Sequence, residues 1–200
     1  GYTAERWPAT IRSMAAAGHE IAHHGYLHES VAALSAAAEE AVLVRGLAAL
    51  DAVTGRAPSG WRAPMWEASW SSAELLHKHG FRYDSSLMDS DQPYLLAAGT
   101  AASIVELPIH WSLDDWEPYV YLPDLSGSGA IASPTDVIAR WTLELDAMVA
   151  AGGLFNLTNH PFVSGRPSRA AGLEALIRHA QSIDGLWITT CDEIARWVEQ

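Results

Sequence analysis

Short apolar runs alternate with longer helical patterns along the whole chain, and glycine and proline separate them. This order restricts the fold more than any other feature of the sequence. A strand–helix–strand–helix order favours a parallel sheet or barrel covered by helices over a sandwich or a helical bundle. The 200 residues are enough for one domain with a substantial core. We therefore expect an α/β fold in a single domain, residues 1–200.

The spacing of apolar residues and the positions of helix-ending residues predict the individual elements. Ser35 is expected to cap a helix that ends at Gly55, and the glycines at 152 and 153 are expected to end another. Helices are predicted over residues 3–17, 35–53, 71–78, 135–151, 168–181 and 190–199. Strands are predicted over residues 61–63, 81–87, 103–110, 154–158 and 186–189, with a short apolar run at 19–24 and a Gly/Ser-rich loop at 123–134.

The charge of the chain excludes some partners. Its formal net charge is -12, and such a surface repels nucleic acid and anionic lipid. No apolar stretch comes near the roughly 18 residues that span a bilayer. Neither nucleic acid nor a membrane is therefore an expected partner. The single cysteine, Cys191, is compatible with a reducing compartment.

Four of the nine histidines fall within residues 19–28. They form two pairs at a spacing of four residues, His19 with His23 and His24 with His28. Neutral imidazole is a good zinc ligand, so the second pair is a candidate metal site at the end of an apolar run. A structural histidine cluster explains the spacing about as well. Because side chains alternate along an extended run, we expect His24 to meet His28 while His19 and His23 point away.

Two further positions follow predicted strands. Arg62 stands between Trp61 and Trp66, where it could hold a carboxylate by paired hydrogen bonds or lie on the surface. His160 follows the run 154–158 and precedes Pro161, a position suited to a general acid or base and equally to a core histidine.

Tryptophans gather in two parts of the sequence. They could form a wall for a sugar or another flat ring, and at least two of them are expected to lie in the core. These tryptophans are Trp61, Trp66, Trp70, Trp111 and Trp116.

Taken in order, these segments resemble the polysaccharide deacetylase family, carbohydrate esterase family 4. The resemblance rests on four motifs: His24-Gly-Tyr-Leu-His28, Arg62-Ala-Pro64, Tyr83-Asp84-Ser85-Ser86 and Asn156-Leu-Thr-Asn-His160. The forms around His24 and His160 are similar to a subgroup that includes intracellular peptidoglycan-deacetylase-like proteins, allantoinases and cyclic imidases.

The resemblance implies a distorted (β/α) barrel and hydrolysis of a non-peptide C–N bond in a saccharide or another small molecule. His24 and His28 would bind a divalent metal, with Zn²⁺ expected. His160 would protonate the leaving nitrogen, and Arg62 would orient an acidic group. Residues expected to bind substrate are Trp66, Asp84, Asp115 and Trp116.

The sequence also departs from the family pattern. Gly25 occupies the position of a serine or threonine in the metal motif. The family's Asp-Asp motif, which supplies a base and a metal ligand, is absent before His19, and Asp114-Asp115 comes too late to take that role. We therefore expect a chain that lacks its first one or two βα units and binds metal weakly, unless Asp84, Asp114 or Asp115 substitutes.

Two alternatives to a polysaccharide deacetylase stay open: a hydrolase of small cyclic amides, and a carbohydrate-binding relative without catalysis. The resemblance further implies a cytoplasmic homo-oligomer, expected to be a tetramer. The segment 118–131 is rich in apolar residues and is predicted to be either the subunit interface or a lid. His160 is expected within reach of His24 and His28.

Overall fold

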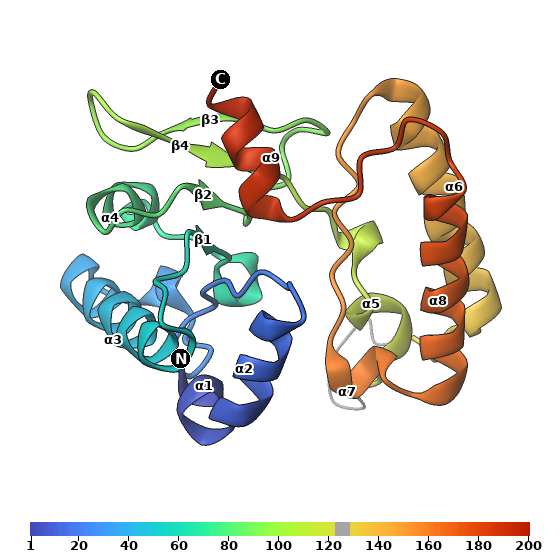
Figure 1. The fold of residues 1–200 in the computed structure, drawn as a ribbon, viewed down its shortest axis with the longest axis horizontal. Helices are drawn as coiled ribbons and strands as arrows, with labels where there is room; N and C mark the ends of the chain where they lie inside the picture. The colour runs from blue at the N-terminus through green and yellow to red at the C-terminus, as the bar shows by residue number, and fades with distance from the viewer. Residues whose placement is uncertain (123–128) are drawn as a thin grey trace. The chain divides into compact units, whose positions relative to one another are not determined.

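The computed structural model describes residues 1–122 and 129–200 (Figure 1). Contacts along the chain group it into two compact units, Gly1–Pro108 with Thr189–Gln200 as unit 1 and Ile109–Ile188 as unit 2. Each unit is described by itself below. A single domain over residues 1–200 stays a prediction.

Unit 1 is built on a four-stranded sheet with the order β1-β2-β4-β3. The strands are β1 (Gly60–Trp61), β2 (Tyr83–Asp84), β3 (Tyr94–Ala97) and β4 (Ser103–Glu106). β1, β2 and β4 are parallel, and β3 returns antiparallel to β4. His23 extends the sheet by one parallel bridge to Trp61. The α/β class is confirmed. The sheet is mixed, because β3, which was not predicted from the sequence, runs antiparallel to β4.

Helices of unit 1 come before, between and after these strands along the chain. They are α1 (Tyr2–Arg6), α2 (Pro8–Ala16), α3 (Ala36–Thr54), α4 (Ser72–Lys78) and α9 (Cys191–Val198), with 3₁₀ turns at Val31–Ala33 and Pro64–Trp66. Ser35 accepts a hydrogen bond from the Ala38 amide, and Gly55 ends α3 with φ at 71°, as predicted. The single helix expected over 3–17 is wrong, because Pro8 starts a new helix and excludes Trp7 from helical geometry.

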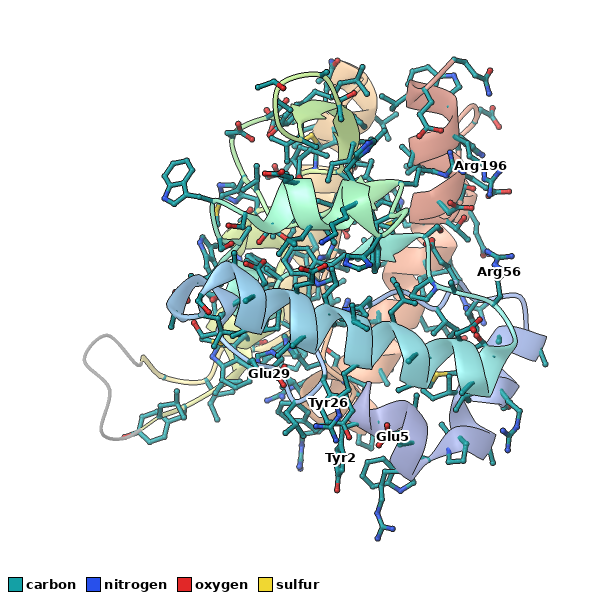
Figure 2. The ribbon with its side chains drawn as sticks, turned by 90° about the vertical axis from the view of Figure 1, so that its left-hand side faces the viewer. Tyr2, Glu5, Tyr26, Glu29, Arg56 and Arg196 are labelled. Atoms are coloured by element: carbon teal, nitrogen blue, oxygen red, sulfur yellow. The ribbon has the colours of Figure 1, made fainter. Side chains whose placement is uncertain are left out.

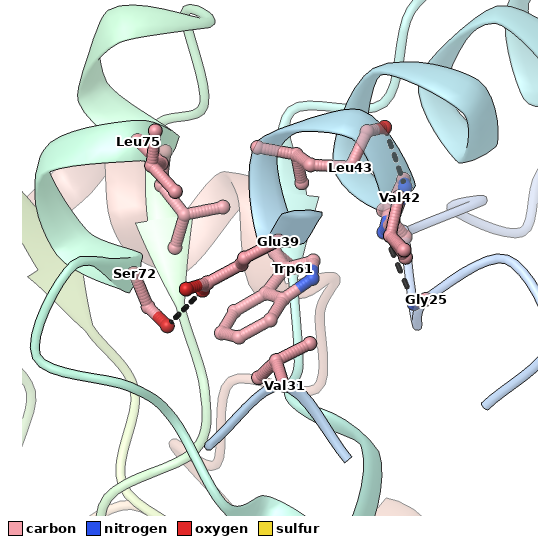
Figure 3. Close-up of a pocket in the computed structure, with 10 residues that line it drawn as sticks. Gly25, Val31, Glu39, Val42, Leu43, Trp61, Ser72 and Leu75 are labelled. Atoms are coloured by element: carbon pink, nitrogen blue, oxygen red, sulfur yellow. Dashed lines mark hydrogen bonds between the residues drawn. The ribbon is translucent and has the colours of Figure 1, made fainter. Parts of the chain in front are cut away.

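The core of unit 1 lies between the sheet and the helices α3 and α4. Trp61, Leu76 and Ile104 are each at most 3% exposed and belong to one cluster. A small pocket opens beside this cluster, and the carboxylate of Glu39 in it accepts a hydrogen bond from Ser72 (Figure 3). Because Glu39 is buried, this bond satisfies a polar group that would be costly to bury without a partner.

Unit 2 is helical, with α5 (Trp116–Tyr119), α6 (Pro134–Ala151), α7 (Pro161–Ser164) and α8 (Pro167–Gln181). The long helices α6 and α8 lie side by side (Figure 1). Trp141, 2% exposed, is central to their core, and its indole N–H donates to the carbonyl of Ser112. In the part of the chain that the structure describes, no helix is long and apolar enough to cross a membrane.

Two predicted strands of the second half are wrong. Residues 154–158 and 186–189 form no strand in the described chain; of them only Thr158 makes a bridge, with Asp114. A strand needs a neighbouring backbone over several residues, and apolar content alone does not provide one. The distorted barrel therefore stays a prediction.

The segment 118–131, expected to be a lid or an interface, is not uniformly exposed. Tyr119 is 3% exposed and packs in the unit 2 core, with its ring edge-to-face on Trp141. Tyr119 therefore contributes neither to a lid nor to a subunit interface. Tyr121 is exposed, and residues 123–128 of this segment and of the predicted Gly/Ser-rich loop lie outside the described residues.

The contact between Gly46 in α3 and His23 yields a test of the packing in unit 1. A Cβ added at Gly46 would lie 2.2 Å from Nε2 of His23. Replacing a helical glycine by alanine normally stabilises a helix by about 1 kcal/mol, but overpacking costs about 1–3 kcal/mol. We expect Gly46→Ala to lower the free energy of unfolding, measured with urea. In a His23→Ala background the same change should stabilise, and stabilisation in both backgrounds would contradict the packing described.

Candidate active site

Polar side chains gather at the carboxyl ends of the parallel strands of unit 1. His24 follows the bridge at His23, Arg62 follows β1, and Glu106 ends β4. Because parallel strands run in one direction, the residues that follow them share one edge of the sheet. The local structure thereby brings together side chains from three segments that are distant in the sequence.

His24 and His28 form a close pair, as predicted. Their ring centroids lie 4.9 Å apart with the planes at 76°. Nδ1 of His24 lies 2.8 Å from the carbonyl oxygen of Arg62. A carbonyl only accepts, so Nδ1 carries the hydrogen and the lone pair of His24 is on Nε2. Metal-binding histidines commonly have this arrangement, in which a backbone carbonyl holds the ring and sets the tautomer.

The neighbouring His23 has a structural role. It is 1% exposed, its Nδ1 accepts from the Gly25 amide, and its Nε2 donates to the Leu43 carbonyl. Burial lowers the pKa of His23 to about 4, so that the ring is neutral at pH 7. His19 lies exposed before the bridge. The prediction that His23 points away from the pair is confirmed.

Gly25 is required by the turn between the paired histidines. Its φ is 74°, and an added Cβ would lie 3.0 Å from the ring of Pro64. Glu29 holds the same turn through hydrogen bonds from the amides of Tyr26 and Leu27. Tyr26 and Glu29 are labelled in Figure 2. Gly25, which departs from the family motif, thus belongs to a turn that the carboxylate of Glu29 stabilises.

Arg62 is held on the loop that follows β2. Its Nε–H donates to the carbonyl of Ser85 at 2.8 Å, and a terminal nitrogen donates to the Ser85 hydroxyl at 2.7 Å. The hydroxyl of Ser85 donates in turn to the carbonyl of Leu107. The guanidinium is therefore fixed by two strand ends, half-buried beside His24.

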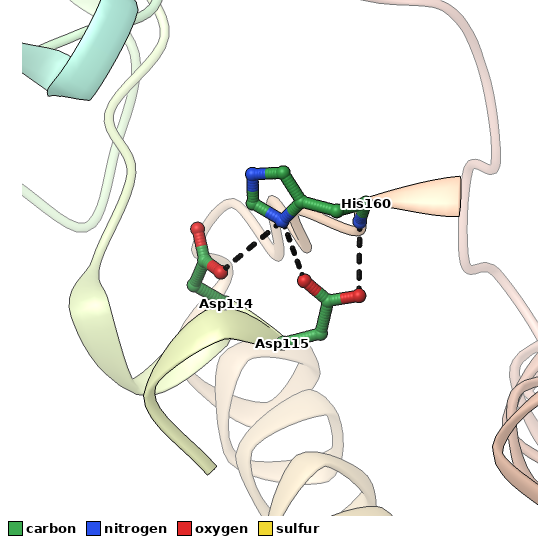
Figure 4. Close-up of side chains that lie close together, drawn as sticks. All are labelled: Asp114, Asp115 and His160. Carbon is green, nitrogen blue, oxygen red and sulfur yellow. Dashed lines mark hydrogen bonds and ion pairs between the residues drawn. The ribbon is translucent and has the colours of Figure 1, made fainter. Parts of the chain in front are cut away.

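In unit 2, His160 and Asp115 form a hydrogen-bonded pair (Figure 4). Nδ1 of His160 lies 2.6 Å from Oδ1 of Asp115, and the His160 amide donates to Oδ2 at 2.9 Å. The Ser164 hydroxyl also donates to Oδ2. Asp115 is fully buried, whereas the side chain of His160 is 31% exposed. An ionised carboxylate only accepts, so the arrangement places the hydrogen of His160 on Nδ1 and its lone pair on Nε2.

The same region is also a candidate metal cluster. Asp114, Asp115 and His160 each offer one ligand atom within 4.8 Å of the others. Oδ1 of Asp114 already accepts from the Trp116 amide at 2.6 Å, and both oxygens of Asp115 accept hydrogen bonds. These bonds favour a histidine–carboxylate pair, although a metal could replace the hydrogen between them.

The residues expected to bind substrate differ in their exposure. Trp116 is 36% exposed, and its ring centroid lies 5.5 Å from that of His160. Trp66, Asp84 and Asp115 are all buried, which favours a supporting role over direct contact with a substrate. Trp61 and Trp66 lie in the core, as expected for at least two tryptophans. Sequence reasoning missed Glu106, Glu29 and Ser164, of which only Glu106 carried a signal, as an acid closing an apolar strand.

Comparisons with known proteins show the family of the chain. Residues 1–83 match the family model described as polysaccharide deacetylase. The peptidoglycan deacetylase of Helicobacter pylori is 34% identical over 98% of this chain and 75% of its own length. The chain belongs to the polysaccharide deacetylase family. Members of the polysaccharide deacetylase family are hydrolases of carbon–nitrogen bonds other than peptide bonds.

Solved structures of known proteins share the fold. A Mycobacterium smegmatis protein assigned to the family is 52% identical, with a TM-score of 0.93 over 99% of this chain and 69% of its own. A crystal structure of an allantoinase is 27% identical, with a TM-score of 0.83 over 96% of this chain and 63% of its own. The chain is therefore similar to deacetylases and to an allantoinase over nearly its whole length.

The pair formed by His160 and Asp115 can be tested without a substrate. In Asp115→Asn the amide can donate to Nδ1, so we expect the hydrogen of the neutral ring to move to Nε2. Nitrogen-15 NMR of the histidine ring reports the tautomer directly. Asp114→Asn is the matched control and should leave Nδ1 protonated, because Asp114 lies 3.8 Å from this nitrogen. An unchanged tautomer in Asp115→Asn would contradict the assignment.

Proposed function

We propose that this protein is a metal-assisted N-deacetylase acting on an acetylated amino sugar of peptidoglycan or a similar polysaccharide. The observation that carries the proposal is the pair formed by His160 and the buried Asp115. Nitrogen is a poor leaving group unless it is protonated, and a histidine held by a carboxylate is suited to deliver that proton. The similarity to a peptidoglycan deacetylase supports the polymer as substrate.

His24 and His28 are the proposed metal ligands. The donor set fits zinc, since both are imidazoles and the Arg62 carbonyl sets the tautomer of His24 with its lone pair on Nε2. Two histidines are one fewer than the usual three protein ligands of a catalytic zinc, so a further ligand is needed. When bound, a divalent ion polarises the amide carbonyl and lowers the pKa of a water ligand to about 7.

The chain's own residues would orient the reaction and move the proton. His160 would receive a proton at Nε2 and transfer it to the leaving nitrogen, while Asp115 holds Nδ1 and stabilises the charged ring. Arg62 would orient an acidic group with the guanidinium that Ser85 fixes. Trp116 would lie against the sugar, since its ring is partly exposed beside His160. Asp84 would act through Arg62, because it is only 1% exposed.

A second candidate is a hydrolase of small cyclic amides. It is favoured by the similarity to the allantoinase structure, which extends over nearly all of this chain. Ring opening of a cyclic amide needs the same protonated nitrogen and the same polarised carbonyl, so the site residues would be unchanged. Assays with an acetylated glycan and with allantoin separate the two functions, and inactivity on both would support the carbohydrate-binding alternative. Assembly as a homotetramer and a cytoplasmic location stay predictions.

Replacing His160 tests the proton donor. We expect His160→Ala to lower turnover of the N-acetylated glycan by about 10²–10⁴-fold, the usual contribution of a positioned acid. Zinc content, measured on the same samples, should not change. His110→Ala is a matched control, because His110 lies in the same unit and bonds to Ser112. Loss of zinc in His160→Ala would make His160 a ligand and contradict its proposed role.

Zinc titration of single variants tests the metal ligands. His24→Ala or His28→Ala should weaken zinc binding by more than about tenfold, because losing a residue that only hydrogen-bonds to a metal ligand already costs about that much. His19→Ala is the control from the same segment and should bind as tightly as the parent chain. Tight binding in all three, abolished only by Asp115→Asn, would place the metal at the cluster of Asp114, Asp115 and His160 instead.

A further inference from the structure

Two buried acids, Asp84 and Glu106, lie opposite each other on neighbouring strands. They are partners in the parallel register of β2 and β4, and they are 1% and 0% exposed. We propose that Asp84 and Glu106 share one proton and together form the positioning pair that fixes Arg62 and His24. This inference rests on the proposed function, because Arg62 and His24 matter only if the site is catalytic.

The need for a shared proton follows from the hydrogen bonds of the two acids. Oε1 of Glu106 accepts from the amides of Ser86 and Leu87 at 3.0 and 2.9 Å. Oε2 is buried and has no hydrogen-bond partner among the residues that the structure describes. Two buried neighbouring carboxylates cannot both be ionised at moderate cost. A proton on Oε2, donated to Asp84, satisfies the orphaned oxygen and removes one charge.

The charged and titratable groups around the pair agree with one remaining negative charge. Burial is the main cause that raises the pKa of Glu106, and the neighbouring Asp84 adds to it. Burial also raises the pKa of Asp84, and the positive charge of Arg62, which follows β1, acts to lower it. Tyr94, on β3, interacts electrostatically with both acids and donates its hydroxyl to Asp89. One positive neighbour thus faces one shared anion.

The pair is connected to the site by short hydrogen bonds. Oδ1 of Asp84 accepts from the Ser85 amide and from the Ser86 hydroxyl. Ser86 accepts at the same hydroxyl from the Ala63 amide at 2.8 Å, and Ser85 holds the guanidinium of Arg62. The carbonyl of Arg62 then holds His24. The two acids therefore determine where the segment carrying Arg62 lies.

The shared proton can be measured directly on the unmodified chain. With carbon-13 in the glutamate carboxyl groups, one signal should keep the chemical shift of a protonated acid at pH 7, although free glutamate ionises near pH 4.3. That signal should be missing in Glu106→Gln. If every glutamate is ionised at pH 7, the proposal is overturned.

Two variants of Glu106 test the positioning role. Glu106→Gln keeps the accepting oxygen and supplies an N–H to Asp84, so it should preserve the NMR signal of the Arg62 Nε–H, assigned with Arg62→Lys, and nearly full kcat/KM. Glu106→Leu removes both the accepting oxygen and the donor to Asp84. It should shift or broaden that signal and lower kcat/KM by about 10–100-fold, the usual effect of losing a residue that supports a site residue.

The outcomes separate this inference from the proposed function. An Arg62 signal unchanged in Glu106→Leu, or lost equally in Glu106→Gln, would overturn the positioning role. If the parent chain hydrolyses neither the N-acetylated glycan nor allantoin, the proposed function fails, while the two NMR measurements still decide the pair. If Glu106→Leu does not fold, Glu106→Gln and the unmodified chain supply both NMR readouts.

Discussion

The parallel hydrogen bonding between His23 and β1 is the interaction on which the site of unit 1 depends. The His23 amide donates to the carbonyl of Gly60, and the Arg62 amide donates to the carbonyl of His23. These two bonds place the residues after the bridge beside the residues after β1. Since His24 and Arg62 follow directly, the carbonyl of Arg62 meets the ring of His24 without any adjustment of the turn. The histidine pair and the arginine are thus brought together by backbone pairing.

Residues of similar chemistry have different roles according to their burial: buried ones support, and exposed ones are the candidate reacting groups. His23 is buried and neutral, and both of its ring nitrogens bond to the backbone, whereas the next residue, His24, is exposed and faces His28. In unit 2, Asp115 is fully buried and holds the partly exposed His160. A fully buried group does not touch a substrate, but it can hold its neighbour in one orientation. His160 therefore has a buried partner that sets its tautomer, whereas the backbone carbonyl of Arg62 sets that of His24.

Several parts of the site could be predicted from local sequence alone. The spacing of His24 and His28 was sufficient, because alternation along an extended run puts His23 on the other face. The caps of α3 at Ser35 and Gly55 were also local, since a side-chain acceptor and a left-handed residue act within one turn. The strands predicted at 154–158 and 186–189 failed because strand formation depends on a distant backbone. β3 (Tyr94–Ala97) was missed although its partner β4 is close in the sequence and Gly99, with φ at 84°, marks the turn between them.

The sequence by itself determined the α/β class, the family motifs and which residues are candidates to bind a metal or transfer a proton. Those properties depend on residue type and on spacing of a few positions. Only the tertiary structure decided that Asp115 supports His160, that Asp84 pairs with Glu106, and that Gly25 and Tyr119 serve a turn and a core. Pairings across 22 or 45 residues depend on strand register and helix packing. The physical reason is that burial, which changes an acid from a ligand into a support, is a property of the folded neighbours and not of the residue.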